Sequence, residues 1–167
     1  MYYINYFFLY SLFGHLLEST LYLIIGNNGK SGYLLGPWTP VYGLGIVIIL
    51  LINNFIKKHI KLKKYQQMII LFLAAAVLLS AIEWLGGISI EYFFHYTCWD
   101  YSNYTFNIGK YVSLETALIW GTLSVLFVLF LKKVSDKIVS KIPKYITYSL
   151  IIIFIIDNIL TVIKRLK

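Results

Sequence analysis

Long apolar runs, separated by short polar loops, constrain the fold of this 167-residue chain more than any other feature. A helix needs about 20 mainly apolar residues to cross the hydrocarbon core of a bilayer. Helices also satisfy their backbone hydrogen bonds internally, as lipid surroundings require. The sequence therefore predicts an all-α polytopic transmembrane helix bundle, a single domain over residues 1–167. About five spans are expected, at residues 2–25, 38–56, 66–94, 111–131 and 145–163.

The composition supports this class. Hydrophobic residues make up 59% of the chain and charged residues 13%, which excludes an ordinary soluble domain and makes the lipid bilayer the main partner. The net charge of +8 comes from lysines in short loops, which indicates membrane orientation and headgroup contact, so we expect no nucleic-acid partner. Cys98 is the only cysteine, and no metal-ligand spacing occurs, so we expect no disulfide, metal or cofactor. We expect the first run to be retained as a span.

A glycine- and proline-rich segment, residues 26–45, interrupts the apolar runs with six glycines and two prolines. Glycine tolerates positive φ and proline removes a backbone donor, so a plain helix is not expected here. Such backbone must be covered by protein or line a water-filled cavity, which makes it a candidate site. Gly29-Lys30-Ser31 is not a phosphate loop, because Ile24 stands where that motif needs glycine. The expected structural residues are Gly36, Pro37, Pro40, Tyr42 and Gly43.

Basic residues predict the orientation. The loops at 57–64 and 132–144 hold ten: Lys57, Lys58, Lys61, Lys63, Lys64, Lys132, Lys133, Lys137, Lys141 and Lys144. The opposite side holds five: Lys30, Lys110, Lys164, Arg165 and Lys167. The positive-inside rule therefore places the N-terminus and the two basic loops in the cytoplasm, although the basic C-terminal tail argues the other way. The polar loop at 95–110 then lies outside.

With this topology, acidic residues fall toward the outer half of their spans. They are Glu18, Glu83, Glu91, Glu115 and Asp157. Each costs roughly 2.5–3.5 kcal/mol at bilayer depth, and no lysine or arginine lies in the middle of a span to pair with it. One interpretation is hydration or bonding to Tyr, Trp and Ser at span ends. The others are protonation, a cationic ligand, or Lys30 and Lys110 folding back from the loops. Asp157 fits an interhelical contact equally well.

Helical spacing places the deeper acids with other polar residues. Ser11, His15, Glu18 and Tyr22 share one face of the first span, and Ser80, Glu83, Gly87 and Glu91 share one face of the third. His15 could hydrogen-bond Glu18 and poise a proton carrier, although a lone histidine on such a face is more often structural.

Several short motifs, called sequence boxes here, occur in this chain in the same order as in a known family. They are Gly14 and Glu18, the run from Gly36 to Gly45, Glu83, Trp99-Asp100-Tyr101-Ser102, Asn107-Ile108-Gly109-Lys110 and Trp120-Gly121. On these residues the chain resembles the ABC-transporter permease family, type IV (CmpB-like), over about residues 10 to 125. Two turns that carry arginine in the family have Ser31 and Lys110 instead. Lysine keeps the charge but loses the bidentate fork.

The resemblance implies a transporter or permease-like membrane component, with any ATP-driven role supplied by a separate ATPase subunit. We expect an acidic pocket near the outer leaflet that binds a small solute, in a multi-pass protein of a bacterial plasma membrane. Two alternatives stay open: a membrane enzyme acting on a lipid or lipid-linked substrate, which we favour less, and a non-catalytic scaffold subunit. The expected ligand-binding or proton-coupling residues are His15, Glu18, Lys30, Glu83, Glu91, Asp100 and Lys110, with Trp99, Asn107 and Gly109 shaping the outer loop.

Overall fold

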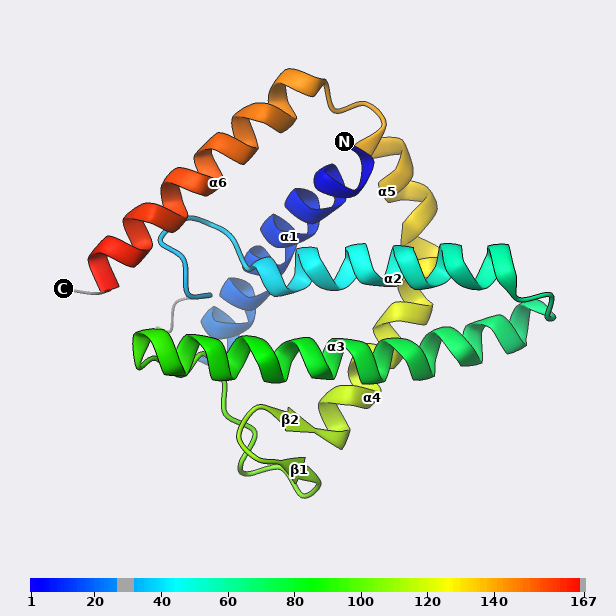
Figure 1. Cartoon of the computed structure of the whole chain (residues 1–167), viewed down its shortest axis with the longest axis horizontal. Coiled ribbons are helices and arrows are strands. Elements are labelled where there is room, and N and C mark those ends of the chain that lie inside the picture. Colours follow the sequence, from blue (N-terminus) through cyan, green and yellow to red (C-terminus); the bar gives the residue numbers. More distant parts are fainter. Residues whose placement is uncertain (27–31, 166–167) are drawn as a thin grey trace. The chain divides into compact units, whose positions relative to one another are not determined.

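The computed structural model describes residues 1–26 and 32–165. Within these residues the chain is mostly helical (Figure 1). The elements are α1 (Tyr2–Ile25), α2 (Pro40–His59), α3 (Lys64–Phe94), β1 (Asn107–Ile108), β2 (Val112–Ser113), α4 (Leu114–Leu126), the π-helical turn η1 (Phe127–Leu131), α5 (Lys132–Val139) and α6 (Lys144–Arg165).

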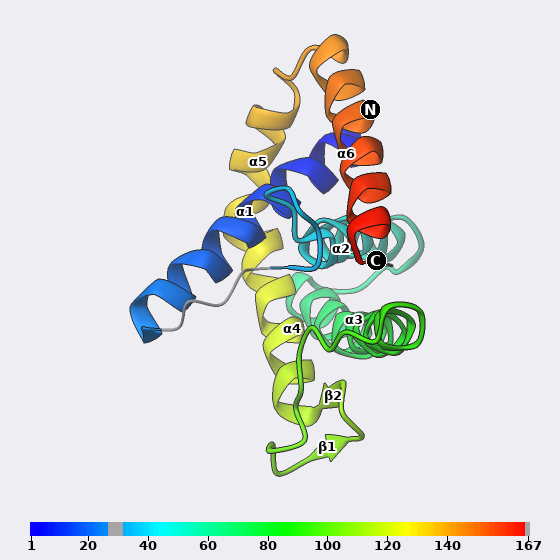
Figure 2. The same ribbon diagram turned by 90° about the vertical axis from the view of Figure 1, so that its left-hand side faces the viewer.

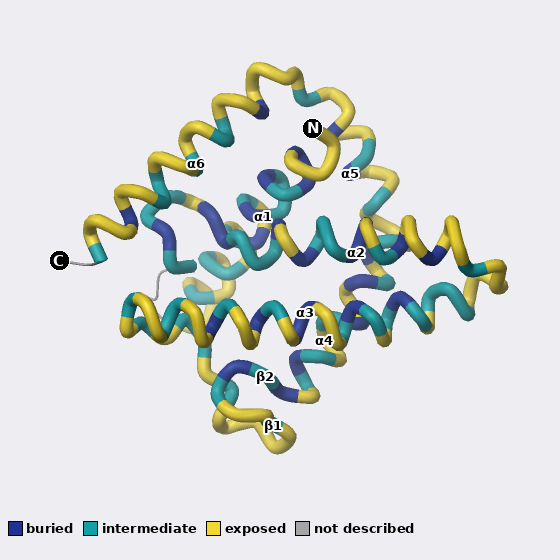
Figure 3. The backbone as a smooth tube through the Cα atoms, in the orientation of Figure 1, coloured by how far each residue is buried: buried dark blue, intermediate teal, exposed yellow. Residues whose placement is uncertain are grey.

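Five helices in the described residues are long and apolar enough to cross a membrane, which confirms the predicted fold class. They are α1, α2, α3, the continuous stretch Leu114–Val139, and α6. Much of each helix is exposed, as Figure 3 shows by colour, and many of the exposed side chains are large and hydrophobic. At the end of α1, for example, Leu23, Ile24 and Ile25 are 77%, 76% and 74% exposed. Lipid would cover such surface in a bilayer.

The helices form two compact units. The first unit contains residues 1–47 and 135–167, and the second contains residues 48–134. Each unit is described separately below. The expectation of one membrane domain over the whole chain stays a prediction.

In the first unit, two glycines let α1 and α2 approach closely. A Cβ atom at Gly43 would overlap the Ser11 hydroxyl and the Phe7 carbonyl, and one at Gly14 would overlap the Tyr42 ring. Small residues at helix contacts are typical of membrane bundles, where backbones pack directly against each other. Gly14 and Gly43, which both belong to the recurring sequence boxes, are therefore packing residues.

The glycine- and proline-rich segment is non-helical only in part. Gly26 ends α1 with a φ of 72°, and residues 32–39, which include Gly36 and Pro37, form bends without helix. The prediction of loop structure is wrong for Pro40, Tyr42 and Gly43, because α2 already begins at Pro40. Proline is favourable at the first position of a helix, where its missing N–H would have no partner.

The second unit is built on the packing of α3 against α4. A Cβ atom at Gly121 would lie 2.8 Å from the Phe72 ring and 3.0 Å from the Phe72 carbonyl oxygen, so this glycine sets the approach of α4 to α3. Helix α3 continues through Gly86 and Gly87 to Phe94 without a break.

A short antiparallel hairpin precedes α4 and delays its start relative to the predicted residue 111. Strands β1 and β2 pair Asn107 with Ser113 and Ile108 with Val112 (Figure 2). Gly109 turns the chain between them with a φ of 65°. Ser113 then caps α4, since its Oγ accepts a hydrogen bond from the Thr116 backbone N–H at 3.1 Å.

Candidate functional site

Most of the acidic residues are engaged in local structure. The chain contains seven, and five of them accept hydrogen bonds that hold a loop or a helix end. These are Glu91 with Lys110, Asp100 with the Ser102 N–H, Glu115 with the Phe106 N–H, Asp136 with Tyr2 and Tyr6, and Asp157 with the Gly36 N–H. The remaining two, Glu18 and Glu83, are the deep acids that the sequence singles out.

Glu83 lies on α3 in the second unit and is only 5% exposed. The Tyr101 hydroxyl, from the WDYS box, donates a hydrogen bond to Glu83 Oε1 at 3.2 Å. The Trp120 side chain, from α4, is a second polar neighbour of the carboxyl group. No described residue donates a well-aligned hydrogen bond to the buried Oε2. Three separate sequence boxes, far apart in the chain, thus meet at one buried carboxyl group.

Aromatic residues of the loop after α3 lie against the same helix. Gly87 leaves room for the Tyr111 ring, which a Cβ atom would overlap, and Gly86 lies beneath Trp99. The Trp99 and Tyr111 rings meet edge to face at 6.2 Å between centroids. The absence of side chains at the two glycines therefore lets the loop pack directly on α3, one turn from Glu83.

Further buried polar atoms near this part of α3 lack partners. The hydroxyl of Ser80, three residues before Glu83, and the indole N–H of Trp99 are both buried without a hydrogen-bond partner among the described residues. A buried polar group without a partner costs about 1–3 kcal/mol, so such groups are rare unless water or a ligand satisfies them. With Glu83 Oε2, they supply both donor and acceptor capacity.

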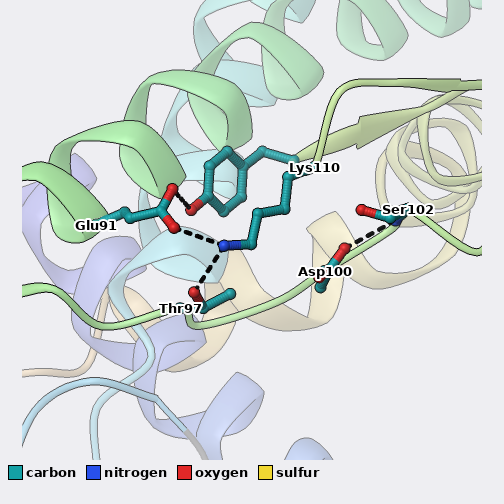
Figure 4. Close-up of polar contacts among 6 residues, drawn as sticks. Glu91, Thr97, Asp100, Ser102 and Lys110 are labelled. Carbon is teal, nitrogen blue, oxygen red and sulfur yellow. Dashed lines mark hydrogen bonds and ion pairs between the residues drawn. The ribbon is translucent and has the colours of Figure 1, made fainter.

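A cluster of polar contacts between Glu91, Thr97, Lys110 and Tyr111, called the polar lock here, holds the loop against the end of α3 (Figure 4). Lys110 Nζ forms an ion pair with Glu91 Oε1 at 2.5 Å and donates to Thr97 Oγ1 at 3.0 Å. The Tyr111 hydroxyl donates to the other oxygen of Glu91. The sequence predicts Lys30 or Lys110 above Glu18 and Glu83. Lys110 pairs with Glu91 instead, because Glu91 lies near the end of α3 beside the loop.

The lock shifts the titration of the loop residues. The hydrogen bond to Glu91 raises the pKa of Lys110 above its usual value. Burial, followed by the hydrogen bond to Glu91, raises the pKa of Tyr111. Hydrogen bonds from Ser102, whose N–H lies 2.8 Å from Asp100 Oδ1, lower the pKa of Asp100. Lys110 and Asp100 are therefore charged at neutral pH.

The two loop boxes also bind each other through the backbone. The Tyr101 N–H donates to the Lys110 carbonyl at 2.8 Å, and Asn107 Nδ2 donates to the Ser102 carbonyl at 3.0 Å. Asn107 and Gly109 therefore shape the hairpin that positions Tyr101 over Glu83. Trp99 lies in the same loop, as predicted, outside any helix or strand.

In the first unit, one face of α6 holds the non-helical segment. The Gly36 N–H donates to Asp157 Oδ1 at 2.9 Å, and the Leu35 N–H donates to Thr161 Oγ1 at 3.1 Å. Arg165 donates to the Tyr33 carbonyl at 3.2 Å and stacks on the Tyr33 ring. This set was not predicted from the sequence, although Asp157, Thr161 and Arg165 follow each other at intervals of four.

A second polar contact of the first unit was also missed. The hydroxyls of Tyr2 and Tyr6, on the first turns of α1, donate to Asp136 Oδ1 of α5 at 2.6 and 2.7 Å. The Thr147 hydroxyl donates to Asn5 Oδ1 at 2.6 Å. The spacing of Tyr2, Asn5 and Tyr6 on one helix face was the available signal.

The other predicted residues are placed as follows. His15 and Glu18 are half-buried on α1, three residues apart, in the first unit. Glu83 belongs to the second unit, so a site shared by Glu18 and Glu83 stays a prediction. Lys30 lies outside the described residues.

An open groove in the first unit is apolar. It is lined by Tyr3, Ile4, Phe7, Phe8, Leu44, Val47, Ile151 and Phe154. No carboxylate lines this groove, so it is not the acidic pocket that the sequence predicts. Among the described residues, no group of three or more His, Cys, Asp or Glu side chains is arranged to hold a metal ion.

Comparison with known proteins agrees with the sequence boxes. No curated protein and no solved structure matches the chain. Residues 5–162 match the model of one family, described as "Putative ABC-transporter type IV". The match covers nearly the whole chain and reaches all five candidate spans, leaving out only the first residues of α1 and the last residues of α6. This multi-pass membrane protein is therefore a member of the CmpB-like type IV ABC-transporter family.

Proposed function

We propose that the chain is a membrane subunit of an ABC transporter that binds a small cationic solute at Glu83. The observation that carries the proposal is the state of this carboxyl group. It is buried, its Oε2 receives no well-aligned hydrogen bond from a described residue, and no described lysine or arginine forms an ion pair with it.

The cost of burial explains why a cation is the expected ligand. An ionised carboxylate without a partner is strongly disfavoured in a low-dielectric site. An ammonium group would donate to Oε2 and neutralise the charge. The rings of Tyr101 and Trp120 beside the carboxyl group suit a cation as well, because aromatic faces attract positive charge.

The other predicted site residues receive distinct roles. Glu18, with His15 three residues before it, is proposed as a second ligand- or proton-binding acid. Glu91, Lys110 and Asp100 hold the loop that covers this end of α3, and Lys30 is proposed at the outer mouth. The site would lie toward the outer leaflet of a bacterial plasma membrane.

A separate ATPase subunit is the proposed energy source, since the family name implies ATP-driven transport. The chain itself is accounted for by membrane helices and a short outer hairpin in its described residues. The ATPase would bind on the side of the basic loops, which the lysine count places in the cytoplasm.

A non-catalytic scaffold subunit is the second candidate. The observation in its favour is that five of the seven acids hold loops or helix ends, and that the open groove is apolar. In that case Glu83 would serve only to fix Tyr101 and Trp120.

One experiment separates the two candidates. The tagged chain is extracted from its own membranes in mild detergent, and the eluate is assayed for an ATPase subunit by mass spectrometry and for vanadate-sensitive ATP hydrolysis. We expect the ATPase to co-purify with both the wild type and Glu83→Gln, with hydrolysis altered in the variant. Equal hydrolysis by both complexes would favour the scaffold. If no ATPase subunit co-purifies even after cross-linking in intact cells, the transporter proposal fails.

A further inference from the structure

The turn between α5 and α6 presents an outward surface of lysines and apolar residues. This surface, called the 137–145 surface here, consists of Lys137, Ile138, Lys141, Lys144 and Tyr145. All five are exposed, with Ile138 at 47% and Tyr145 at 69%. It belongs entirely to the first unit.

The opposite face of α5 is turned inward and fixed. Ser135 and Val139 are buried, and the Ser135 hydroxyl lies 2.7 Å from the Tyr10 hydroxyl. Asn5 Nδ2 donates to the Val139 carbonyl at 3.4 Å. These contacts turn Ser135 and Val139 toward α1, whereas Lys137 and Ile138 between them are exposed.

The acid Asp136 bonds to α1 and is not part of the 137–145 surface, which carries only positive charge. It is the only acid between residues 132 and 144, and its carboxylate accepts hydrogen bonds from both Tyr2 and Tyr6. Two hydrogen bonds from α1 therefore hold its carboxylate toward α1. No other acid lies between residues 132 and 144, and Lys137, Lys141 and Lys144 are exposed.

The 137–145 surface lies at the ends of two membrane spans. The apolar stretch Leu114–Val139 ends here, and the next span begins at Lys144. The surface therefore lies where hydrocarbon gives way to water. Lysines at that depth meet lipid phosphates, and Ile138 and Tyr145 suit the boundary between headgroups and acyl chains.

We propose that the 137–145 surface binds the phosphate headgroups of anionic phospholipids in preference to zwitterionic ones. The charge complementarity is direct, because the surface offers three ammonium groups and no carboxylate. Each basic residue near an anionic membrane surface contributes about a fivefold gain in association. Three lysines acting together should then discriminate by at least about tenfold.

The test measures lipid retention by the purified protein. The intact chain in detergent is titrated with phosphatidylglycerol or phosphatidylcholine, and bound lipid is counted by native mass spectrometry. The test variant combines Lys137→Gln, Lys141→Gln and Lys144→Gln. The matched control combines Lys57→Gln, Lys58→Gln and Lys61→Gln, which removes the same charge from the other basic loop. A third variant carries arginine at the three test positions and keeps the charge.

We expect the wild type, the control and the arginine variant to retain phosphatidylglycerol over phosphatidylcholine, and the test variant to lose at least about tenfold of this preference. Equal losses in test and control variants would show a general effect of net charge and overturn the proposal. So would undiminished retention by the test variant. If the test variant does not fold, the wild type and the arginine variant are compared at low salt and in 1 M salt. High salt screens the charges, so both proteins must lose their preference for phosphatidylglycerol if the proposal holds. A wild type that instead retains RNA or an acidic protein and shows no lipid preference also refutes the proposal.

Discussion

Single hydrogen bonds hold the outer loop and the non-helical segment in place. Lys110 is shared between Glu91 and Thr97, and Asp157 accepts from the Gly36 backbone. Glu91 of α3 bonds a lysine side chain of the loop, whereas Asp157 of α6 accepts from a backbone N–H of irregular structure, which lipid could not satisfy. Both contacts are therefore expected to affect stability locally, and each gives a prediction.

Removal of the Asp157 side chain should destabilise the first unit. Asp157→Ala leaves the Gly36 N–H without an acceptor, and we expect a loss of about 1–3 kcal/mol in the free energy of unfolding. Asn158→Ala is the matched control, because among the described residues Asn158 bonds only to the Phe154 carbonyl of its own helix. Denaturant unfolding in detergent should show the larger loss for Asp157→Ala. Equal losses would mean that the bond to Gly36 is not needed.

The ion pair of Lys110 should make stability fall at high pH. Since Glu91 raises the pKa of Lys110 in the folded chain, the stabilisation is fully present below the unfolded value of about 10.5. It is lost as the pH rises through the folded pKa. The melting temperatures of the wild type and Lys110→Met, compared from pH 8 upward, should differ by a constant amount and converge only above about pH 10.5. Convergence already near pH 8 would contradict the ion pair.

At the scale of the elements, glycines determine how closely the helices approach. Gly121→Ala would place a Cβ atom 2.8 Å from the Phe72 ring and 3.0 Å from its carbonyl oxygen. We expect a destabilisation of about 1–3 kcal/mol from overpacking, despite the higher helix propensity of alanine. Gly86→Ala is the control, because its Cβ would meet only Trp99 at 3.8 Å. That substitution should be neutral or stabilising in thermal unfolding, and the reverse order would show that α3 and α4 pack differently.

The membrane spans were predictable because long apolar runs have few other outcomes. Shorter elements were not, since β1 and β2 have two residues each and give no alternating pattern. The role of Gly43 was also misassigned. A glycine at position 43 can serve either close approach to Ser11 or irregular backbone, and the sequence does not distinguish the two.

The sequence predicts which residues belong to the candidate site better than it predicts which of them contact each other. Glu83, Tyr101 and Trp120 stood in separate sequence boxes, and only the folded second unit shows that they meet. The pairing of Lys110 with Glu91 was missed because a flexible lysine can reach several acids. From the sequence Asp157 fits two interpretations, and its hydrogen bond from the backbone N–H of Gly36 supports the structural one.

At the scale of the whole molecule, the orientation in the membrane still rests on the lysine count. In a Cys98→Ser background, Lys61→Cys should react with an impermeant thiol reagent only after the cells are opened. Asn103→Cys should react in intact cells, because the loop at 95–110 is predicted to lie outside. The opposite labelling pattern would invert the protein and place Glu83 toward the cytoplasmic half.

The central claim is that the buried carboxyl group of Glu83 binds a cationic solute. Glu83→Gln keeps the acceptor for Tyr101 and removes the charge, so the variant should fold at least as stably as the wild type. Glu115→Gln is the matched control, with the same change at an acid bonded to the Phe106 N–H.

The measurement is thermal unfolding of the three purified proteins with ammonium, methylammonium, choline and spermidine. At about 100 times the dissociation constant, at least one of these cations should raise the melting temperature of the wild type and of Glu115→Gln by about 5–10 °C. The same cation should leave Glu83→Gln unchanged. A shift retained by Glu83→Gln, or no shift in the wild type with any of the four cations, would contradict the account.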